Sequence, residues 1–163
     1  MQDKKFLELT IQLAEEAYKL NSIPIGAVLV DSEGEIVSKA FCEMKITNDE
    51  TAHAEILCIR QAKESVNPKH NPQKLTMYTS LEPCFACTYF ITRTNIKKVV
   101  WALSDPLGGG MTELKDSPKL KKDIENIEQI AEPYAGIKIE SKALLRSYFE
   151  KKGKVEMVKL FSL

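Results

Sequence analysis

The 163-residue chain contains no uninterrupted apolar run that approaches the ~18 residues needed to cross a membrane. Its first residues lead into an amphipathic segment and not into the apolar core of a signal peptide. Without a secretory signal, its four cysteines are not expected to form a disulfide framework. These absences predict a cytoplasmic protein that does not associate with membranes.

An excess of charge of one sign is also missing. Lys and Arg total 23, as do Asp and Glu, so the net charge gives no indication of nucleic-acid binding. One local asymmetry lies near the end of the chain, where two acidic residues are outnumbered by six basic ones: Lys142, Arg146, Lys151, Lys152, Lys154 and Lys159. This basic segment is either a solvated helix face or a patch that contacts phosphates.

Phosphate-binding loops are absent as well. The glycine-rich segment 105–110 has neither the G-x-x-x-x-G-K-[ST] nor the G-x-G-x-x-G spacing, so it is interpreted as a flexible turn or the rim of an active site. No internal repeat or low-complexity segment is found. Residues 1–163 are therefore expected to form a single domain.

The pattern of apolar residues predicts alternating helices and strands. Helices are expected at 4–20, 51–65, 84–94, 118–131 and 142–152, and strands at 25–30, 35–40, 75–79, 97–102 and 136–140. Strands that alternate with helices favour a sheet covered on both faces. The predicted fold class is α/β, a three-layer α-β-α sandwich around a central mixed sheet of about five strands.

The most informative motif is His53-Ala54-Glu55, followed 28 residues later by Pro83-Cys84-Phe85-Ala86-Cys87. One histidine and two cysteines can hold zinc and leave its fourth position open for water, as in a catalytic site. His-x-Glu followed by Pro-Cys-x-x-Cys is the signature of zinc deaminases. Cys84 and Cys87 would lie on one face of a helix start, where the helix dipole favours thiolates. We therefore predict a Zn²⁺ site at which two helix N-termini meet.

Glu55 lies two residues after His53, roughly 200° around a helix, which disfavours both as ligands of one ion. It is predicted to shuttle protons: zinc would lower the pKa of a bound water to about 7, and Glu55 would pass its proton to a ring nitrogen before ammonia leaves. Two other interpretations are a thioredoxin-like redox pair and a structural zinc site completed by Cys58 or His70.

These motifs resemble the cytidine deaminase-like superfamily, and most of all its bacterial tRNA-specific adenosine deaminases and guanine deaminases. Residues 23–28, Ile-Pro-Ile-Gly-Ala-Val, are similar to a family strand whose preceding loop forms part of the base pocket. Residues 49–55, Asp-Glu-Thr-Ala-His-Ala-Glu, resemble the family's D-P-T-A-H-A-E. Residues 101–105 stand where the family has a strand that runs into a loop on the substrate side. The resemblance covers about residues 5–112 and resumes in the final helix.

The resemblance implies a homodimer in which His53, Cys84 and Cys87 bind zinc and Glu55 is catalytic. It implies substrate contacts at Ala54, Cys42, Pro24, Ile25, Glu82, Pro83 and Asp105. The expected activity is zinc-dependent hydrolytic deamination of a nucleobase, adenosine to inosine in tRNA. Deamination of a free base or nucleoside (guanine, cytosine or cytidine) is the first alternative, and a catalytically silent zinc-binding or RNA-binding homologue is the second.

Two features depart from the family pattern and bear on the substrate. Cys42 occupies the position of an asparagine that usually hydrogen-bonds the base, and a thiol is a poor donor and acceptor. The segment 115–134 is longer than the usual connection in tRNA deaminases. The motif therefore predicts the reaction more firmly than the substrate.

Overall fold

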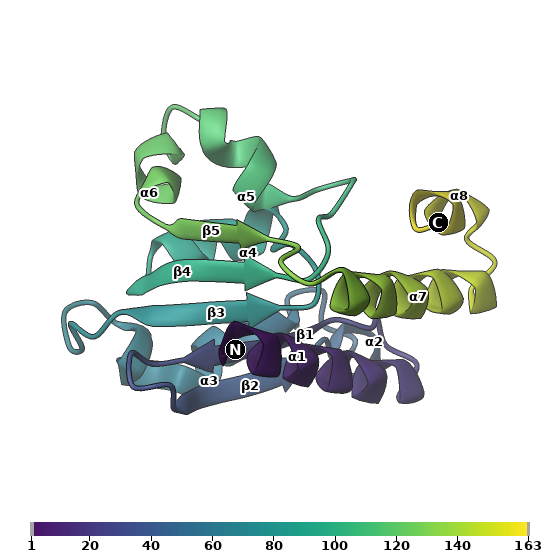
Figure 1. Ribbon diagram of the computed structural model, residues 1–163, viewed down its shortest axis with the longest axis horizontal. Helices are drawn as coiled ribbons and strands as arrows, with labels where there is room; N and C mark the ends of the chain where they lie inside the picture. Colours follow the sequence, from purple (N-terminus) through teal and green to yellow (C-terminus); the bar gives the residue numbers. More distant parts are fainter. Residues whose placement is uncertain (1, 163) are drawn as a thin grey trace.

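A computed structural model describes residues 2–162, apart from the side chain of Lys115. Its sheet has five strands in the order β2-β1-β3-β4-β5 (Figure 1). β1 pairs antiparallel with β2 and β3, whereas β3, β4 and β5 run parallel, so the predicted mixed sheet is confirmed. The strands are β1 Gly26–Val30, β2 Ile36–Phe41, β3 Leu75–Thr79, β4 Ile96–Trp101 and β5 Glu128–Ala131.

Helices cover both faces of this sheet, which confirms the three-layer prediction. α1 (Gln2–Lys19) and α7 (Ala135–Lys151) lie side by side on one face, and α3 (Ala54–Ala62) and α4 (Phe85–Thr92) lie on the other (Figure 1). Short helices fill the connections: α2 Met44–Thr47, α5 Gly110–Glu113, α6 Lys121–Glu125, α8 Val155–Leu160 and the 3-10 turns η1 Lys63–Val66 and η2 Leu114–Asp116. Within residues 2–162, no helix has both the length and the apolar character required to span a bilayer.

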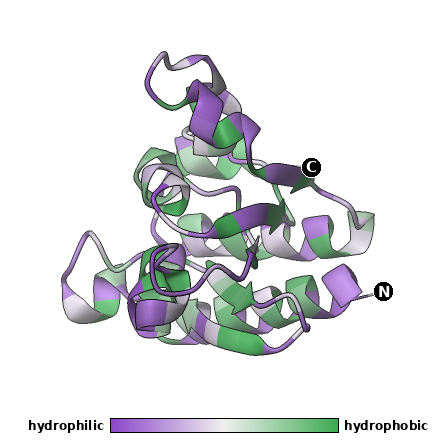
Figure 2. Ribbon diagram, turned by 90° about the vertical axis from the view of Figure 1, so that its left-hand side faces the viewer, coloured by the Kyte–Doolittle hydropathy of each residue, from purple (hydrophilic) through white to green (hydrophobic). Residues whose placement is uncertain are grey.

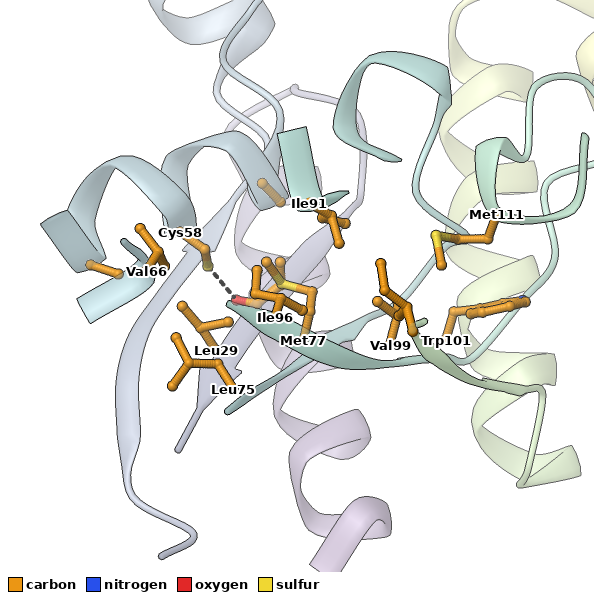
Figure 3. Packing of buried hydrophobic residues seen from close by; sticks show 14 of the residues in the cluster. Leu29, Cys58, Val66, Leu75, Met77, Ile91, Ile96, Val99, Trp101 and Met111 are labelled. Atoms are coloured by element: carbon orange, nitrogen blue, oxygen red, sulfur yellow. Dashed lines mark hydrogen bonds between the residues drawn. The ribbon is translucent and has the colours of Figure 1, made fainter. Parts of the chain in front are cut away.

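The core follows from the alternation of side chains along each strand. Val28 and Val100 face α1 and α7, whereas their neighbours Leu29 and Val99 face α3 and α4. Figure 2 shows the resulting apolar colouring through the middle of the molecule, and Figure 3 shows the packing on the α3 side. The central strands are buried on both faces, which explains their nearly continuous apolar sequences.

The helix predicted at residues 118–131 is wrong. Ile124 and Ile127 are buried in the core, as their spacing predicted, but the helix is confined to α6. Residues 128–131 instead form β5 and pair with residues 98–101 of β4. Without β5 the edge of β4 would leave its backbone groups unpaired, and this pairing overrides local helix propensity.

The strand predicted at residues 136–140 is also wrong, because α7 begins at Ala135. Ile137 and Ile139 alternate with polar residues, which fits a strand over so short a segment. In the structure Ile137, Ser141 and Leu145 recur every four residues along one buried helix face. Ile139 points away from that face and is 55% exposed.

Candidate active site

Four chain segments meet at one edge of the sheet. The carboxyl ends of the parallel strands β3 and β4 lie there, because Thr79 pairs with Trp101. Antiparallel β1 begins at the same edge, since Ala27 pairs with Thr79, and β2 ends there beside Gly26. The segment before β1 and the segments after β2, β3 and β4 are thereby brought together. In open α/β sheets this edge is where ligands bind.

Two helix starts bring the predicted metal ligands together at this edge. α3 begins directly after His53, and α4 begins directly after Cys84. His53 Nδ1 lies 3.6 Å from Cys84 Sγ and 3.6 Å from Cys87 Sγ. All three ligand atoms lie within 4.8 Å of one another. The side chains that the sequence grouped over 34 positions thus form one cluster.

The dimensions of this cluster fit zinc. A tetrahedral ion with bonds of ~2.3 Å to sulfur and ~2.1 Å to nitrogen separates those two atoms by about 3.6 Å. Neither candidate for a fourth ligand belongs to the cluster: Cys58 Sγ donates to Ala27 O in the core at 3.3 Å (Figure 3), and His70 pairs with Glu64 in an exposed loop. Within the described residues the donor set is therefore one nitrogen and two sulfurs, with room for a further ligand.

The two thiols of the cluster differ in charge when no metal is bound. A hydrogen bond from Cys87 lowers the pKa of the Cys84 thiol to about 4, and His53 acts in the same direction. The neighbouring Cys84 thiolate, together with burial, raises the pKa of Cys87. A divalent cation would favour thiolates at both positions. The cluster is thus already partly prepared to receive a cation.

Glu55 lies beside this cluster without belonging to it. Its side chain is 3% exposed, in the first turn of α3. Burial raises the pKa of the Glu55 carboxyl to about 7. A carboxyl with such a pKa can both accept and donate a proton near neutral pH.

Hydrogen bonds connect the glycine-rich segment to the turn at Glu82-Pro83-Cys84. The buried Glu82 carboxylate accepts hydrogen bonds from Thr112 N at 2.8 Å, from Thr112 Oγ1 at 2.7 Å and from Asp105 N at 3.3 Å. Gly110 N donates to Pro83 O at 2.8 Å. The Glu82 side chain is therefore engaged within the protein, and its backbone N donates to Leu103 O at 2.8 Å. Glu82 directly before Pro-Cys, together with three consecutive glycines, is the sequence signal for this contact.

The other predicted substrate-binding residues belong to the segments that meet at this edge of the sheet. Ala54, Pro24 and Cys42 are buried, and Ile25 is half-buried. Cys42 N donates to Ile25 O at 2.9 Å, and burial raises the pKa of the Cys42 thiol, which keeps it neutral. Asp105 Oδ1 accepts a hydrogen bond from a backbone N–H of its own loop at 2.9 Å. Contact between these residues and a substrate stays a prediction.

Sequence reasoning missed an apolar hollow beside His53. This hollow has a volume of about 280 Å³, and Ile56, Ile59 and Phe90 contribute to its lining. Phe90 is 49% exposed, and Phe85 on the same helix is 46% exposed. The sequence signal for this hollow was the apolar composition of α4, which starts after the predicted ligand Cys84 and exposes Phe85 and Phe90 on its outer side.

A His-Cys-Cys cluster at two helix starts, with a buried carboxyl two residues after the histidine, defines a zinc-dependent hydrolytic deaminase on this fold. Residues 1–103 match the family model of the cytidine and deoxycytidylate deaminase zinc-binding region. The chain therefore belongs to this deaminase family, and zinc is its cofactor.

Known proteins agree with this assignment. The chain is 34% identical to a tRNA-specific adenosine deaminase of Aquifex aeolicus (strain VF5) over 123 residues, which cover 74% of this chain and 80% of the relative. A structure from a study of A-to-I editing by tRNA:A34 deaminases matches with a TM-score of 0.67 and 27% identity, over 80% of this chain and 99% of that chain. The guanine deaminase of Bacillus subtilis matches with a TM-score of 0.52 and 32% identity, over 62% and 64% of the two chains.

Proposed function

We propose that this chain deaminates adenosine to inosine in tRNA. The observation that carries the proposal is the buried Glu55 carboxyl beside the group of His53, Cys84 and Cys87. The likeness to a tRNA-specific adenosine deaminase supports the choice of substrate. A cytoplasmic location is part of this proposal: the structure has no disulfide among the described cysteines, and that compartment keeps thiols reduced.

In this proposal His53, Cys84 and Cys87 hold the metal and Glu55 moves the protons. Zinc, when bound, would supply a Lewis acid that lowers the pKa of water. Glu55 would accept one proton from the attacking water and deliver it to the ring nitrogen next to the amino-bearing carbon. It would then move the remaining proton from the new hydroxyl group to the amino group, which leaves as ammonia while the hydroxyl becomes a carbonyl. One C–O bond forms and one C–N bond breaks: the reactants are the amino-bearing ring and water, and the products are the carbonyl-bearing ring and ammonia.

The remaining predicted residues are assigned to the base pocket. We place the base against the backbone of Ala54 and the Glu82-Pro83 segment, beside Cys42. Pro24 and Ile25, which precede β1, and Asp105, which follows β4, lie at the same edge of the sheet. This arrangement is supported by the meeting of the four segments around the ligand cluster.

The proposed enzyme is a homodimer that associates through α4. Phe85 and Phe90 expose apolar surface on this helix, and the apolar hollow that Ala86 and Phe90 line together with α3 reaches His53. A second copy placed there would exclude water from the metal site. Light scattering after size exclusion should give twice the mass of the chain, and Phe90→Asp should shift the protein to monomers. A monomeric wild type at micromolar concentration would overturn this assignment.

The test of the activity is ammonia release from metal-replete protein, measured with tRNA, adenosine, guanine and cytidine as substrates. Inosine in the tRNA product should be detected by mass spectrometry. Glu55→Gln should retain zinc and lose about 10²–10⁴-fold in turnover, because general acid–base catalysis contributes that much. Unchanged ammonia release by Glu55→Gln would sink the mechanism.

A second candidate function is deamination of free guanine. The likeness to a Bacillus subtilis guanine deaminase supports it, and Cys42 leaves the choice of base open because a buried thiol supplies no amide to hydrogen-bond it. Turnover of guanine without conversion of tRNA adenosine would select this candidate. Added salt separates the two further, because affinity for RNA falls steeply with salt whereas affinity for a free base barely changes.

A further inference from the structure

A second hollow, of about 490 Å³, lies between α2, the end of α1 and the end of α7. Its lining includes three lysines and two aromatic residues, Lys45, Lys152, Lys154, Tyr148 and Phe149. Among the described residues that line it there is no carboxylate. The volume lies within the ~300–1,000 Å³ typical of ligand pockets. We call this site the lysine hollow.

Only part of the basic segment near the chain end contributes to the lysine hollow. Arg146 Nε donates to Glu150 Oε1 at 2.8 Å, and Lys159 Nζ donates to Glu156 Oε1 at 3.0 Å. Lys151 Nζ lies 4.1 Å from the centre of the Tyr18 ring. Lys152 and Lys154 instead join Lys45, which comes from a segment more than 100 positions earlier. The fold therefore concentrates charge that the sequence spreads out.

Short backbone links tie the lysine hollow to the candidate active site. Glu43 N, just before α2, donates to Ala52 O at 2.9 Å, and Ala52 precedes His53. Ile23 lines the hollow and continues directly into Pro24 and Ile25. The lysine hollow and the candidate active site are thus built from adjoining segments of the chain.

The contacts of the lysines leave them able to bind an anion. Lys45 Nζ donates to Glu50 Oε1 at 2.8 Å, but both side chains are well exposed, so this ion pair is weak and exchangeable. Lys152 Nζ lies 5.6 Å from the centre of the Tyr148 ring. The ring itself is fixed, because Tyr148 packs edge-on against Phe149 with centroids 5.3 Å apart. The lysines thus line a hollow whose wall includes the rings of Tyr148 and Phe149.

We propose that the lysine hollow binds a backbone phosphate of the RNA strand next to the target nucleotide. This inference rests on the proposed function, in which the target base belongs to an RNA. Lysine ammonium groups bind phosphates as point charges, and single-stranded nucleic acids are held by cationic grooves lined with aromatic rings. The hollow is linked to the candidate active site through Ile23 and through the hydrogen bond from Glu43 N to Ala52 O.

The test compares two triple variants with the same loss of charge. Lys45→Ala/Lys152→Ala/Lys154→Ala removes the hollow's cations, and Lys142→Ala/Arg146→Ala/Lys159→Ala removes cations of the basic segment outside it. Binding of a fluorescent tRNA stem-loop is measured between 50 and 300 mM salt. Loss of one phosphate contact should reduce the salt slope by about 0.7, so the first variant should lose about 0.7 in slope and roughly 4-fold in affinity at 0.15 M salt. The control variant should lose less than half as much.

Additional arms separate the inference from the function on which it depends. Equal RNA affinity and slope in the hollow variant and the wild type would overturn the inference, even if tRNA deamination is intact. Failure of the wild type to convert tRNA adenosine would instead refute the proposed function. Turnover of adenosine monophosphate that requires the three lysines, while RNA binding does not, would assign the hollow to a mononucleotide and overturn the RNA assignment. Zinc content of both variants should equal that of the wild type, which controls for misfolding.

Discussion

The catalytic edge and the C-terminal region (residues 113–162) differ in how much space surrounds their backbone. A Cβ atom added at Gly110 would lie 2.4 Å from Thr88 Oγ1 and 2.7 Å from Cys84 O. A Cβ added at Gly136 or Gly153 would meet nothing within 4 Å. The turn at Gly110 is thus tightly packed against the Cys84 turn and α4, whereas the backbone at Gly136 and Gly153 has open space around it. A metal site needs ligands that are held in a fixed geometry, whereas contact with a large substrate tolerates a less constrained backbone.

We expect the largest effect when one of two buried cysteines, Cys87 or Cys58, is replaced. Cys87→Ala should remove bound zinc and all detectable ammonia release, because one nitrogen and one sulfur cannot replace the three-ligand set. Cys58→Ala should keep zinc at wild-type stoichiometry and cost about 1–2 kcal/mol of unfolding free energy, since its thiol packs in the core and donates to Ala27 O. Metal content by elemental analysis and denaturant unfolding measure the two effects.

If Cys58→Ala lost zinc and Cys87→Ala kept it, the assigned roles of the two cysteines would be wrong. Loss of zinc from Cys58→Ala would mean that the core beneath α3, and not the turn at α4, controls the metal site. Chelator treatment of the wild type is the matching control, and added zinc should restore its activity.

The next effect is the response of the catalytic edge to one added methyl group. Gly110→Ala should cost about 1–3 kcal/mol of unfolding free energy, because the new Cβ must displace Thr88 and the Cys84 carbonyl. Zinc affinity, measured by competition with a chromogenic chelator, should fall as well, since Cys84 carries a ligand. A variant with wild-type stability and affinity would show that the rim yields more readily than its packing indicates.

Sequence and structure agree most closely where the relevant residues are near one another in the chain. His-Ala-Glu and Pro-Cys-x-x-Cys contain their own helix starts, so their geometry follows from local spacing. β5 could not be predicted in this way, because residues 128–131 become a strand only by pairing with β4. The lysine hollow could not be predicted either, since Lys45 and Lys152 are more than 100 positions apart and line one hollow only in the folded chain. The sequence motifs therefore predicted the reaction, whereas the elements around the site depend on contacts between distant parts of the chain.

The smallest expected effect tests the corrected assignment of residues 136–140 in the C-terminal region. Gly136 is the second residue of α7 and has open space around its Cα, so Gly136→Ala should stabilise the protein by about 0.4–1 kcal/mol by restricting the unfolded chain. Gly136→Val should stabilise it less, because a β-branched residue loses side-chain freedom in a helix. The opposite ranking, valine above alanine, is the order expected of a strand. Thermal unfolding of the two variants under one buffer condition distinguishes the rankings, and a valine variant more stable than the alanine variant would reinstate the strand. Agreement with the helix ranking would also confirm that this region, unlike the turn at Gly110, accepts an added side chain without rearrangement.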